Sequence, residues 1–528
     1  MTDDANSLPH MTNIKELVET GPIAAGSARR SGGRAARMQI RTAAREPLAG
    51  LERNIPPYEI LPPEAIELIH QASLHILQDV GIEFRDAEAL ALWAAAGAEV
   101  SASRVRIPGA LLMQLVGLIP SAFTIHARNP ARSFKLGGKH SAFIPMHGAR
   151  DVLGMDGARG PASKLDLAQF HKLSHLAPEI HALSTGICEP SDMAAPQRHL
   201  HMLASAITHS DKAFTGLAAN RQQAEDSIAI AGLVFGAEGL RQPVLMANVT
   251  CRSPLVWDGP ALEAVKVYAR HGQPCILSPS ALAGASTAAS SAGAVAQVNA
   301  EALAGLAFTQ LVAPGSPQIY GQFIVPVDMR SGAPMGGVPE AAQMTLIFGQ
   351  LARRYHLVWR ASAFHAGSKL ADAQAGYESN MLMHAAILGG AHVINQAAGW
   401  IEAGQTVSYA KFMLDADQLG SWYKYAEGVR LDDLAAAMEA VRQVGPQGHF
   451  LGTAHTLTNF QKAFYTPPLM DFSPLVQWEH EGSRDAATRG AQQAGWTLET
   501  YAEPALGADQ REAIAEFVTR RGREIEAG

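Results

Sequence analysis

Short apolar runs alternate with longer amphipathic segments from about residue 180 onward. The short runs have the length of buried strands, and in the longer segments apolar residues recur every three or four positions, as in a helix. Strands are predicted at eight places: 180–187, 213–216, 244–250, 275–278, 318–323, 357–362, 393–397 and 449–452. Most of the segments between them are predicted helices, at 222–235, 260–271, 293–311, 339–354, 372–388 and 431–444.

This alternation predicts an α/β fold with a parallel sheet and right-handed crossover connections. Eight strand and helix repeats close most naturally into a (β/α)8 TIM barrel. An open doubly wound sheet is the alternative. Against it, no GxGxxG motif follows the first predicted strand, so the usual nucleotide-binding fingerprint is missing.

The regions outside the alternating pattern divide the chain further. Residues 1–50 contain the Arg-, Gly- and Ala-rich run SARRSGGRAARMQIRTAAR, which favours a flexible tail over a targeting or polyanion-binding arm. Residues 51–150 are predicted to form a helical and mixed N-terminal region, and residues 151–475 the barrel. Residues 476–528 read as a C-terminal helical appendage with a helix at 509–525.

The composition is 47% hydrophobic and 17% charged, with a net charge of −7, and it excludes several classes of protein. A nucleic-acid partner would require a basic surplus, which is missing. The three cysteines Cys188, Cys251 and Cys275 lie far apart with no CxxC pair, so neither a disulfide framework nor a thiolate metal site is expected. No apolar run is long enough to cross a bilayer and the first residues are polar, so we expect no membrane segment and a cytoplasmic location.

Polar residues gather where predicted strands end, which is where parallel α/β folds build their active sites. His365 and Lys369 follow the strand at 357–362, and Asp372 is placed as the N-cap of the next helix. Trp400 and Glu402 follow the strand at 393–397, and such an aromatic and carboxylate pair can hold a cation.

Two further strands contribute polar positions. Glu189 follows the strand at 180–187. In the strand at 318–323, Gln318, Tyr320 and Gln322 alternate with apolar neighbours, so one face of that strand is polar. If this face points into the barrel, its side chains require partners or a ligand.

Several more specific catalytic and metal-binding motifs are incomplete or absent. His199 and His201 form an HxH pair, but the surrounding sequence is helical, so the two rings diverge by about 200° and cannot share a metal ion. His171 and His175 have helical spacing without the carboxylate that HExxH requires, and no GxSxG elbow is present. The residues alone therefore predict a soluble α/β barrel with a polar mouth and no metal site.

Several segments in sequence order carry a family resemblance: EPSDMAAPQRHLHMLASAITHSDKAF, QVNAEALAGLAF, YGQF followed by DMRSGAPMGGVPE, DAQAGYES and GWIEAG. Over roughly residues 55–485 the chain resembles the trimethylamine methyltransferase (MttB-like) family. The resemblance implies a (β/α)8 barrel that moves a methyl group from an amine nitrogen to the cobalt of a separate corrinoid protein.

The chain contains no pyrrolysine, the residue that family members acting on trimethylamine carry. We expect the corresponding position within 362–368. The chain therefore resembles the glycine betaine:corrinoid methyltransferases of this family. A quaternary nitrogen is already a good leaving group, so direct attack by Co(I) requires only that the cation is held and oriented.

The resemblance suggests a substrate-binding role for each polar candidate, and no residue is assigned as catalytic. Trp400, Tyr320 and Phe364 are expected to offer aromatic faces to the cation. Glu402 or Glu189 would supply countercharge.

The other end of a betaine would need a different set of side chains. His365 and Lys369 are expected to bind its carboxylate by charge-assisted hydrogen bonds. Asp372 and Gln374 would lie at the mouth, whereas Glu378 could equally orient the loop.

No cofactor is expected to be bound permanently. The chain lacks the DxHxxG signature of cobalamin-binding modules, so the corrinoid would belong to a partner protein that docks at the barrel mouth. The terminal appendages give surface for a homo-oligomer.

Two alternative functions remain at this point. One is a metal-independent barrel lyase or hydrolase that uses His365 with Asp372 or Glu402, and the other is a non-catalytic binder of quaternary amines.

Overall fold

The computed structural model describes residues 48 and 50–527. The described residues form two compact units, of which the smaller is Glu427–Pro468 and the larger contains the rest. Nearly all of the tail predicted at 1–50 lies outside the described residues.

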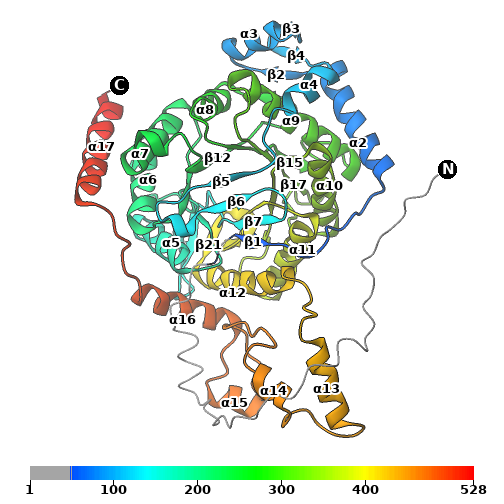
Figure 1. Cartoon of the computed structure of the whole chain (residues 1–528). Coiled ribbons are helices and arrows are strands. Elements are labelled where there is room, and N and C mark those ends of the chain that lie inside the picture. The colour runs from blue at the N-terminus through cyan, green and yellow to red at the C-terminus, as the bar shows by residue number, and fades with distance from the viewer. Residues whose placement is uncertain (1–47, 49, 528) are drawn as a thin grey trace, which may run out of the picture. The chain divides into compact units, whose positions relative to one another are not determined.

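Eight parallel strands of the larger unit form a closed barrel, which confirms the predicted (β/α)8 fold (Figure 1). Backbone pairing joins neighbouring strands in chain order, and the last strand pairs with the first. The His181 N–H, just before the second strand, donates to the Phe143 carbonyl (3.0 Å) and closes the ring. The strands are β7 (His140–Phe143), β10 (Ala182–Leu183), β11 (Ala213–Gly216), β12 (Leu245–Val249), β14 (Cys275–Leu277), β16 (Ile319–Gly321), β18 (Trp359–Ser362) and β19 (Val393–Asn395).

The barrel begins one strand earlier than the sequence predicts. Its first strand is β7, which lies within the predicted N-terminal region, and the strand predicted at 449–452 is wrong because those residues form a bend and a turn without strand pairing. A barrel strand is covered on both faces. Residues 141–143 of β7 are fully buried, whereas Phe450 and Leu451 are exposed, so burial rather than local hydrophobicity separates the two segments.

Helices surround the strands as a ring (Figure 1). Side-chain caps begin several of them, and Asp372 caps the seventh by accepting from the Ala375 N–H, as predicted. Gly390, with φ of +85°, ends that helix in the left-handed conformation that glycine adopts readily. The helices are α5 (Lys164–Leu176), α6 (Arg198–His209), α7 (Arg221–Gly239), α8 (Gly259–Arg270), α9 (Ser291–Val312), α10 (Pro339–Tyr355), α11 (Ala373–Gly389) and α12 (Tyr409–Ala426).

An N-terminal layer covers part of the helical ring. Its helices α2 and α4 contact α9, and it adds a small sheet in the order β13-β2-β4-β3. The elements are β1 (Leu51–Glu52), α2 (Pro63–His75), the π-turn η2 (Ile76–Val80), β2 (Ile82–Phe84), α3 (Ala87–Ala95), β3 (Glu99–Ser101), β4 (Arg104–Arg106), α4 (Gly109–Val116) and β13 (Val256–Trp257).

A hairpin closes the amino-terminal end of the barrel, and two small sheets follow its carboxyl-terminal strand ends. The hairpin is β5 (Phe123–Ile125) and β6 (Phe134–Leu136), with the short helix η3 (Pro130–Arg132) between them. The first sheet pairs β15 (Ser280–Ala283) with β17 (Phe323–Pro326). The second contains β8 (Asp151–Leu153), β9 (Arg159–Pro161), β20 (Trp400–Ile401) and β21 (Thr406–Ser408), with the short helix η4 (Glu402–Gly404).

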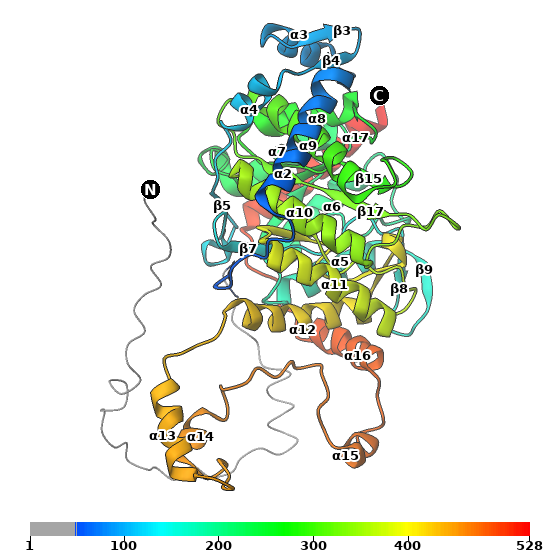
Figure 2. The same cartoon turned by 90° about the vertical axis from the view of Figure 1, so that its right-hand side faces the viewer.

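The C-terminal helices belong to the larger unit. Helix α16 (Ala486–Glu499) lies along α12, as Figure 2 shows, and α17 (Ala508–Ala527) packs on α6 and α7. Helix α15 (Leu475–His480) precedes them, and the smaller unit contains α13 (Leu434–Val444) and α14 (Ala454–Asn459). No helix among the described residues combines the length and apolar character needed to cross a bilayer.

Candidate active site

The side chains that point into the barrel form two layers of different polarity. The lower layer is apolar and packs on the β5–β6 hairpin, with one residue from or directly before each strand: Ala142, Ala182, Ala213, Met246, Ile276, Ile319, Val358 and Val393. Two residues further along each strand the side chain points inward again. This upper layer contains Ile144, Ser184, Thr215, Asn248, Ser278, Gly321, Arg360 and Asn395.

A cavity of about 680 Å³ opens from the upper layer towards the carboxyl-terminal mouth. Ser184, Thr215, Asn248 and Asn395 are among the residues that line it. The Oδ1 atoms of Asn248 and Asn395 are buried and have no hydrogen-bond partner. Because buried polar atoms are normally paired, these two oxygens mark a place where a ligand would complete the structure.

Arg360 places a positive charge in this upper layer. Its side chain is 1% exposed, and its guanidinium donates only to neutral acceptors: the Gln322 carbonyl (2.5 Å), Gln396 Oε1 (2.7 Å) and Ser278 Oγ (3.3 Å). Its Nε–H has no acceptor, and no ion pair among the described residues includes it. Burial lowers the pKa of Arg360 to about 9, so it remains a cation at neutral pH.

An aromatic group stands beside this cation. His365 and Trp400 stack with ring centroids 4.6 Å apart, and the Phe323 ring lies 5.1 Å from His365. His365 Nε2 and Trp400 Nε1 are buried without partners. Burial, reinforced by the charge of Arg360, lowers the pKa of His365 to about 3, so the ring is neutral.

Strained backbone is concentrated in the loops that follow β18 and β19. Phe364, Gln396, Glu402 and Ala403 have φ between +50° and +55°, which side chains other than glycine rarely adopt. Such strain persists where the surroundings fix it and is common at functional sites. Here it turns Gln396 towards Arg360 and within 3.5 Å of His147.

Of the predicted residues, the structure brings His365 and Trp400 together but uses Asp372 and Gln374 to build the loop. Asp372 caps α11 and accepts from Ser368 Oγ (2.8 Å), and the Ala375 N–H holds its pKa low. Gln374 donates to Glu378 Oε1, and Glu378 Oε2 accepts from the Gly367 N–H (2.6 Å). Glu378 therefore orients the loop that carries His365.

Lys369 and Glu402 are also engaged outside the lumen. The ammonium of Lys369 donates to the Gly367 carbonyl and is exposed. Glu402 forms an ion pair with Arg159 and accepts from Thr406 Oγ1 (2.6 Å). Arg159 thus neutralises Glu402, which does not provide the free countercharge that the sequence suggests.

Tyr320 points away from the lumen. Its hydroxyl donates to Asn299 Oδ1 on α9 (2.7 Å), and its ring contacts Phe348 and Tyr355 on α10. The expectation that it offers a face to the substrate is therefore wrong, because strand alternation places it in the layer between strand and helices. Glu189 does line the cavity at its mouth, within 3.5 Å of Arg198.

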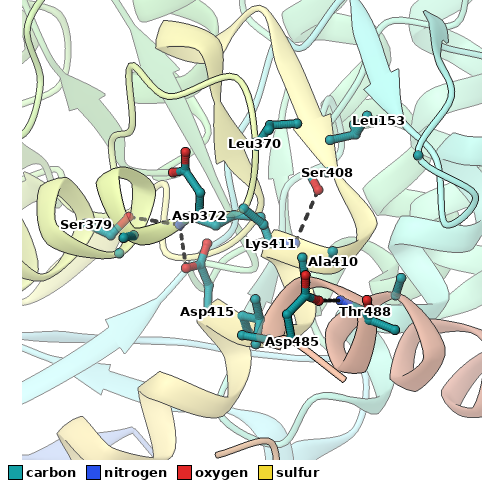
Figure 3. A pocket seen from close by; sticks show the side chains of 18 of the residues that line it. Leu153, Leu370, Asp372, Ser379, Ser408, Ala410, Lys411, Asp415, Asp485 and Thr488 are labelled. Carbon is teal, nitrogen blue, oxygen red and sulfur yellow. Dashed lines mark hydrogen bonds and ion pairs between the residues drawn. The ribbon is translucent and has the colours of Figure 1, made fainter. Parts of the chain in front are cut away.

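Phe364 lines a different cavity of about 870 Å³, outside the barrel and bordered by α11, α12 and α16 (Figure 3). Lys411 lies over the Phe364 ring and donates to Asp415 (2.5 Å) and Ser379 (2.9 Å). Burial raises the pKa of Asp415 to about 6. Lys411 and Asp415 pair with each other, and no described side chain that lines this cavity has a buried polar atom without a partner, in contrast to the lumen.

Sequence reasoning missed the polar residues that the structure places in and beside the upper layer, namely Arg360, Asn248, Asn395, Gln396 and His147. A signal was available, because each of the first three follows an apolar residue by two positions near the end of a strand. Among the described residues, no three His, Cys, Asp or Glu side chains gather where they could hold a metal ion.

A closed parallel barrel with a buried cation, an aromatic pair and unpartnered amide oxygens at its mouth defines a (β/α)8 enzyme for a small polar molecule. The sequence profile of the trimethylamine methyltransferase (MTTB) family matches residues 29–526. The chain belongs to this family.

Its relatives include proteins that are named for betaines. Glycine betaine methyltransferase of Desulfitobacterium hafniense is 36% identical over 475 residues, covering 89% of this chain and 98% of the relative. Proline betaine:corrinoid methyltransferase of Eubacterium limosum is 29% identical and covers 82% and 92%. The monomethylamine methyltransferase structure of Methanosarcina barkeri shares the fold, with a TM-score of 0.50, 11% identity and coverage of 85% and 90%.

Proposed function

We propose that this methyltransferase takes a methyl group from a quaternary amine that also carries a carboxylate, such as glycine betaine, and transfers it to Co(I) of a corrinoid on a separate protein. The names of the betaine relatives support the reaction type. Trimethylamine is disfavoured as substrate, because the chain has no pyrrolysine and trimethylamine has no anionic group.

The observation that carries this proposal is the unpaired charge of Arg360. A cation buried away from water is costly unless an anion or several hydrogen bonds compensate it. Arg360 has neutral acceptors for part of its guanidinium and an unused Nε–H. A substrate carboxylate would supply both the missing acceptor and the missing charge.

The neighbouring groups suit the other end of a betaine. A trimethylammonium group has no N–H to donate, so it is held by ring faces and by partially negative oxygens. The His365 and Trp400 stack offers a ring face, and the free Oδ1 atoms of Asn248 and Asn395 offer oxygens. His365 is neutral, so it does not repel the substrate cation.

The reaction requires orientation rather than proton transfer. The Co(I) electron pair forms the bond to the methyl carbon while the C–N bond breaks, and its electrons stay on nitrogen. The leaving group is then a neutral tertiary amine that needs no proton. Anchoring the carboxylate and the ammonium at two points would align the methyl group with the open mouth.

The corrinoid would arrive with its carrier protein, which would dock at the barrel mouth, and we place the reaction in the cytoplasm. A lyase or hydrolase reaction has less support, because Asp372 and Glu402 are occupied as a helix cap and an ion-pair partner. A silent binder of quaternary amines would use the same lumen, so experiment must separate it from the enzyme.

The test mixes the purified protein with free cob(I)alamin and a panel of glycine betaine, carnitine, choline and trimethylamine, and follows the cobalt spectrum. We expect methylcobalamin with a carboxylate-bearing betaine and little with choline, which has the same cation without the carboxylate. Absence of methylcobalamin from every amine would refute the methyltransferase reaction. Calorimetric binding without turnover would identify a silent binder.

A further inference from the structure

Lys411 and Asp415 form a buried ion pair on α12 that the proposed reaction does not use. Their side chains are 4% and 6% exposed, and the Lys411 ammonium donates to Asp415 Oδ1 (2.5 Å) and to Ser379 Oγ on α11 (2.9 Å), as Figure 3 shows. Removing two charges from water is so unfavourable that a buried ion pair is often no more stable than apolar side chains of the same volume. The pair therefore calls for a role other than stability.

Asp415 fixes the backbone on one side of the aromatic stack that His365 and Trp400 form. Its second carboxylate oxygen accepts from the Gly399 N–H (2.9 Å), and Gly399 directly precedes Trp400. Gly399 has φ of +90°, and a Cβ there would come within 2.9 Å of Val407, so the chain turns tightly at this residue. The charge-assisted bond to its N–H thus holds the turn from which the Trp400 side chain projects.

Lys411 acts on the other side of the aromatic stack. Its ammonium lies 5.2 Å from the centre of the Phe364 ring, and Phe364 directly precedes His365. The backbone of Phe364 has φ of +51°, which a residue with a side chain keeps only when its surroundings hold it there. A desolvated ammonium is attracted to the face of an aromatic ring, so this contact opposes relaxation of the strained residue.

We infer that Lys411 and Asp415 are positioning residues: their ion pair holds the aromatic stack in the arrangement that would bind the ammonium group of the substrate. The inference rests on the proposed function, in which the stack offers a ring face to this cation. Both residues line the cavity outside the barrel and neither lines the lumen cavity, so neither would touch the substrate. Their effect on binding would pass through Phe364 and Gly399.

This arrangement makes the aromatic stack sensitive to the protonation of Asp415. Burial raises the pKa of Asp415 to about 6, although Lys411 and the Gly399 N–H both favour the carboxylate. Below this pH Lys411 loses its counter-charge and Gly399 loses a charged acceptor, whereas His365 stays neutral. The other titratable groups that line the same cavity accept from backbone N–H groups of a turn or a helix start: Asp156, Asp372 and Asp485.

The affinity for glycine betaine as a function of pH tests the inference. Between pH 7.5 and pH 5.5 the dissociation constant of the wild type should rise about threefold to fourfold, because about three quarters of Asp415 is protonated at the lower pH. Asp415→Asn keeps an acceptor for Gly399 without the charge. It should bind roughly tenfold more weakly at pH 7.5 and lose the pH dependence. Wild-type affinity in this variant, or an unchanged pH dependence, would overturn the inference.

Two further variants separate positioning from a general loss of stability. The matched control is Asp417→Asn, which changes another buried carboxylate on α12 that accepts from the Leu469 N–H (3.2 Å). It should keep the wild-type affinity and pH dependence. The double variant Lys411→Met, Asp415→Asn should bind no more weakly than the weaker single variant, because the two side chains act as one pair. Additive losses would contradict this, and thermal unfolding shows that each variant is folded.

A measurement without ligand distinguishes failure of this inference from failure of the proposed function. If the wild type binds no betaine, the proposed function fails, but the order of the aromatic stack is still measurable. Trp400 is 8% exposed, so acrylamide should quench more of the tryptophan fluorescence in Asp415→Asn than in the wild type. The increase should vanish when both proteins also carry Trp400→Leu. No increase, or one that persists without Trp400, would show that the ion pair does not hold the stack.

Discussion

At the scale of single residues, the proposed binding of a carboxylate rests on Arg360. It is a buried guanidinium whose partners in the structure are all neutral. The neutral state of His365 keeps a second positive charge out of the same space. The free protein thus maintains one uncompensated charge, which the proposed substrate would neutralise.

Replacing Arg360 with Met should weaken glycine betaine binding by about 100-fold, because it removes charge-assisted hydrogen bonds worth roughly 1.5–3 kcal/mol each. Binding of choline should be unchanged or stronger. The thermal midpoint should not decrease, because an unpaired buried charge is removed. Isothermal calorimetry and a melting curve measure these effects, and an equal loss for both ligands would contradict the carboxylate contact.

Replacing Trp400 with Leu should weaken betaine binding by roughly 5–30-fold, the value of a desolvated cation–π contact of about 1–2 kcal/mol. The matched control is Trp496→Leu on α16, where the side chain is partly exposed. Calorimetry on both variants would separate a contact with the ligand from a general loss of stability. Equal affinity in the two variants would show that Trp400 does not contact the ligand.

At the scale of elements, the loop between β18 and α11 is held in place from both ends. Glu378 on α11 accepts from the backbone of Gly367 and Ser368. From the other side, Gly336 and Gly337 approach so closely that a Cβ on either would collide with His365 or Glu378. The position of His365 therefore depends on residues that would not touch the substrate.

Glu378→Ala should lower kcat and raise KM together while the protein stays folded, because it frees the backbone of the loop that carries His365. We expect a loss of roughly tenfold or more in kcat/KM, as for the loss of a charged hydrogen bond. Gln374→Ala on the same exposed turn removes only a contact to Glu378 and should change little. Steady-state kinetics on both variants, with circular dichroism as the folding check, tests this.

At the scale of the whole molecule, the barrel, its helices and the N-terminal layer bury many histidines in neutral form. Burial is the largest cause in each case, and it lowers the pKa of six of them to about 3 or 4: His70, His147, His171, His175, His365 and His392. In the unfolded chain each would titrate near its ordinary value of 6.5. Acid therefore favours the unfolded state.

Above pH 6.5 the contribution of these histidines to the free energy of unfolding should be constant. As the pH falls from 6.5 towards 4, the free energy of unfolding should decrease. Between these values the unfolded chain binds protons that the folded chain does not, so unfolding near pH 5 should take up roughly five or six protons on these histidines. Calorimetric melting at several pH values measures the uptake. His392→Gln should reduce it by about one proton, and no change would contradict the buried neutral state.

The sequence predicted the barrel because seven of its eight strands are strongly apolar and separated by clear helical periods. It missed β7, whose four residues include His140 and Ser141, because the burial of that strand comes from β19 and the N-terminal segment. It also placed Tyr320 in the site and overlooked Arg360, although both lie in strands of alternating polarity. Which face of a strand points inward depends on register around the closed barrel, and local composition does not encode that register.

The unpaired charge of Arg360 also means that the lumen would bind the substrate and the product of the proposed reaction differently. Demethylation would convert the zwitterionic substrate into an anion with an uncharged nitrogen. The carboxylate of this product would still bind Arg360, but its nitrogen would no longer be attracted to the Trp400 ring. His365 is neutral, with a pKa of about 3, so it holds no proton to give to this product. The dimethylated amine would regain its positive charge by taking a proton from water.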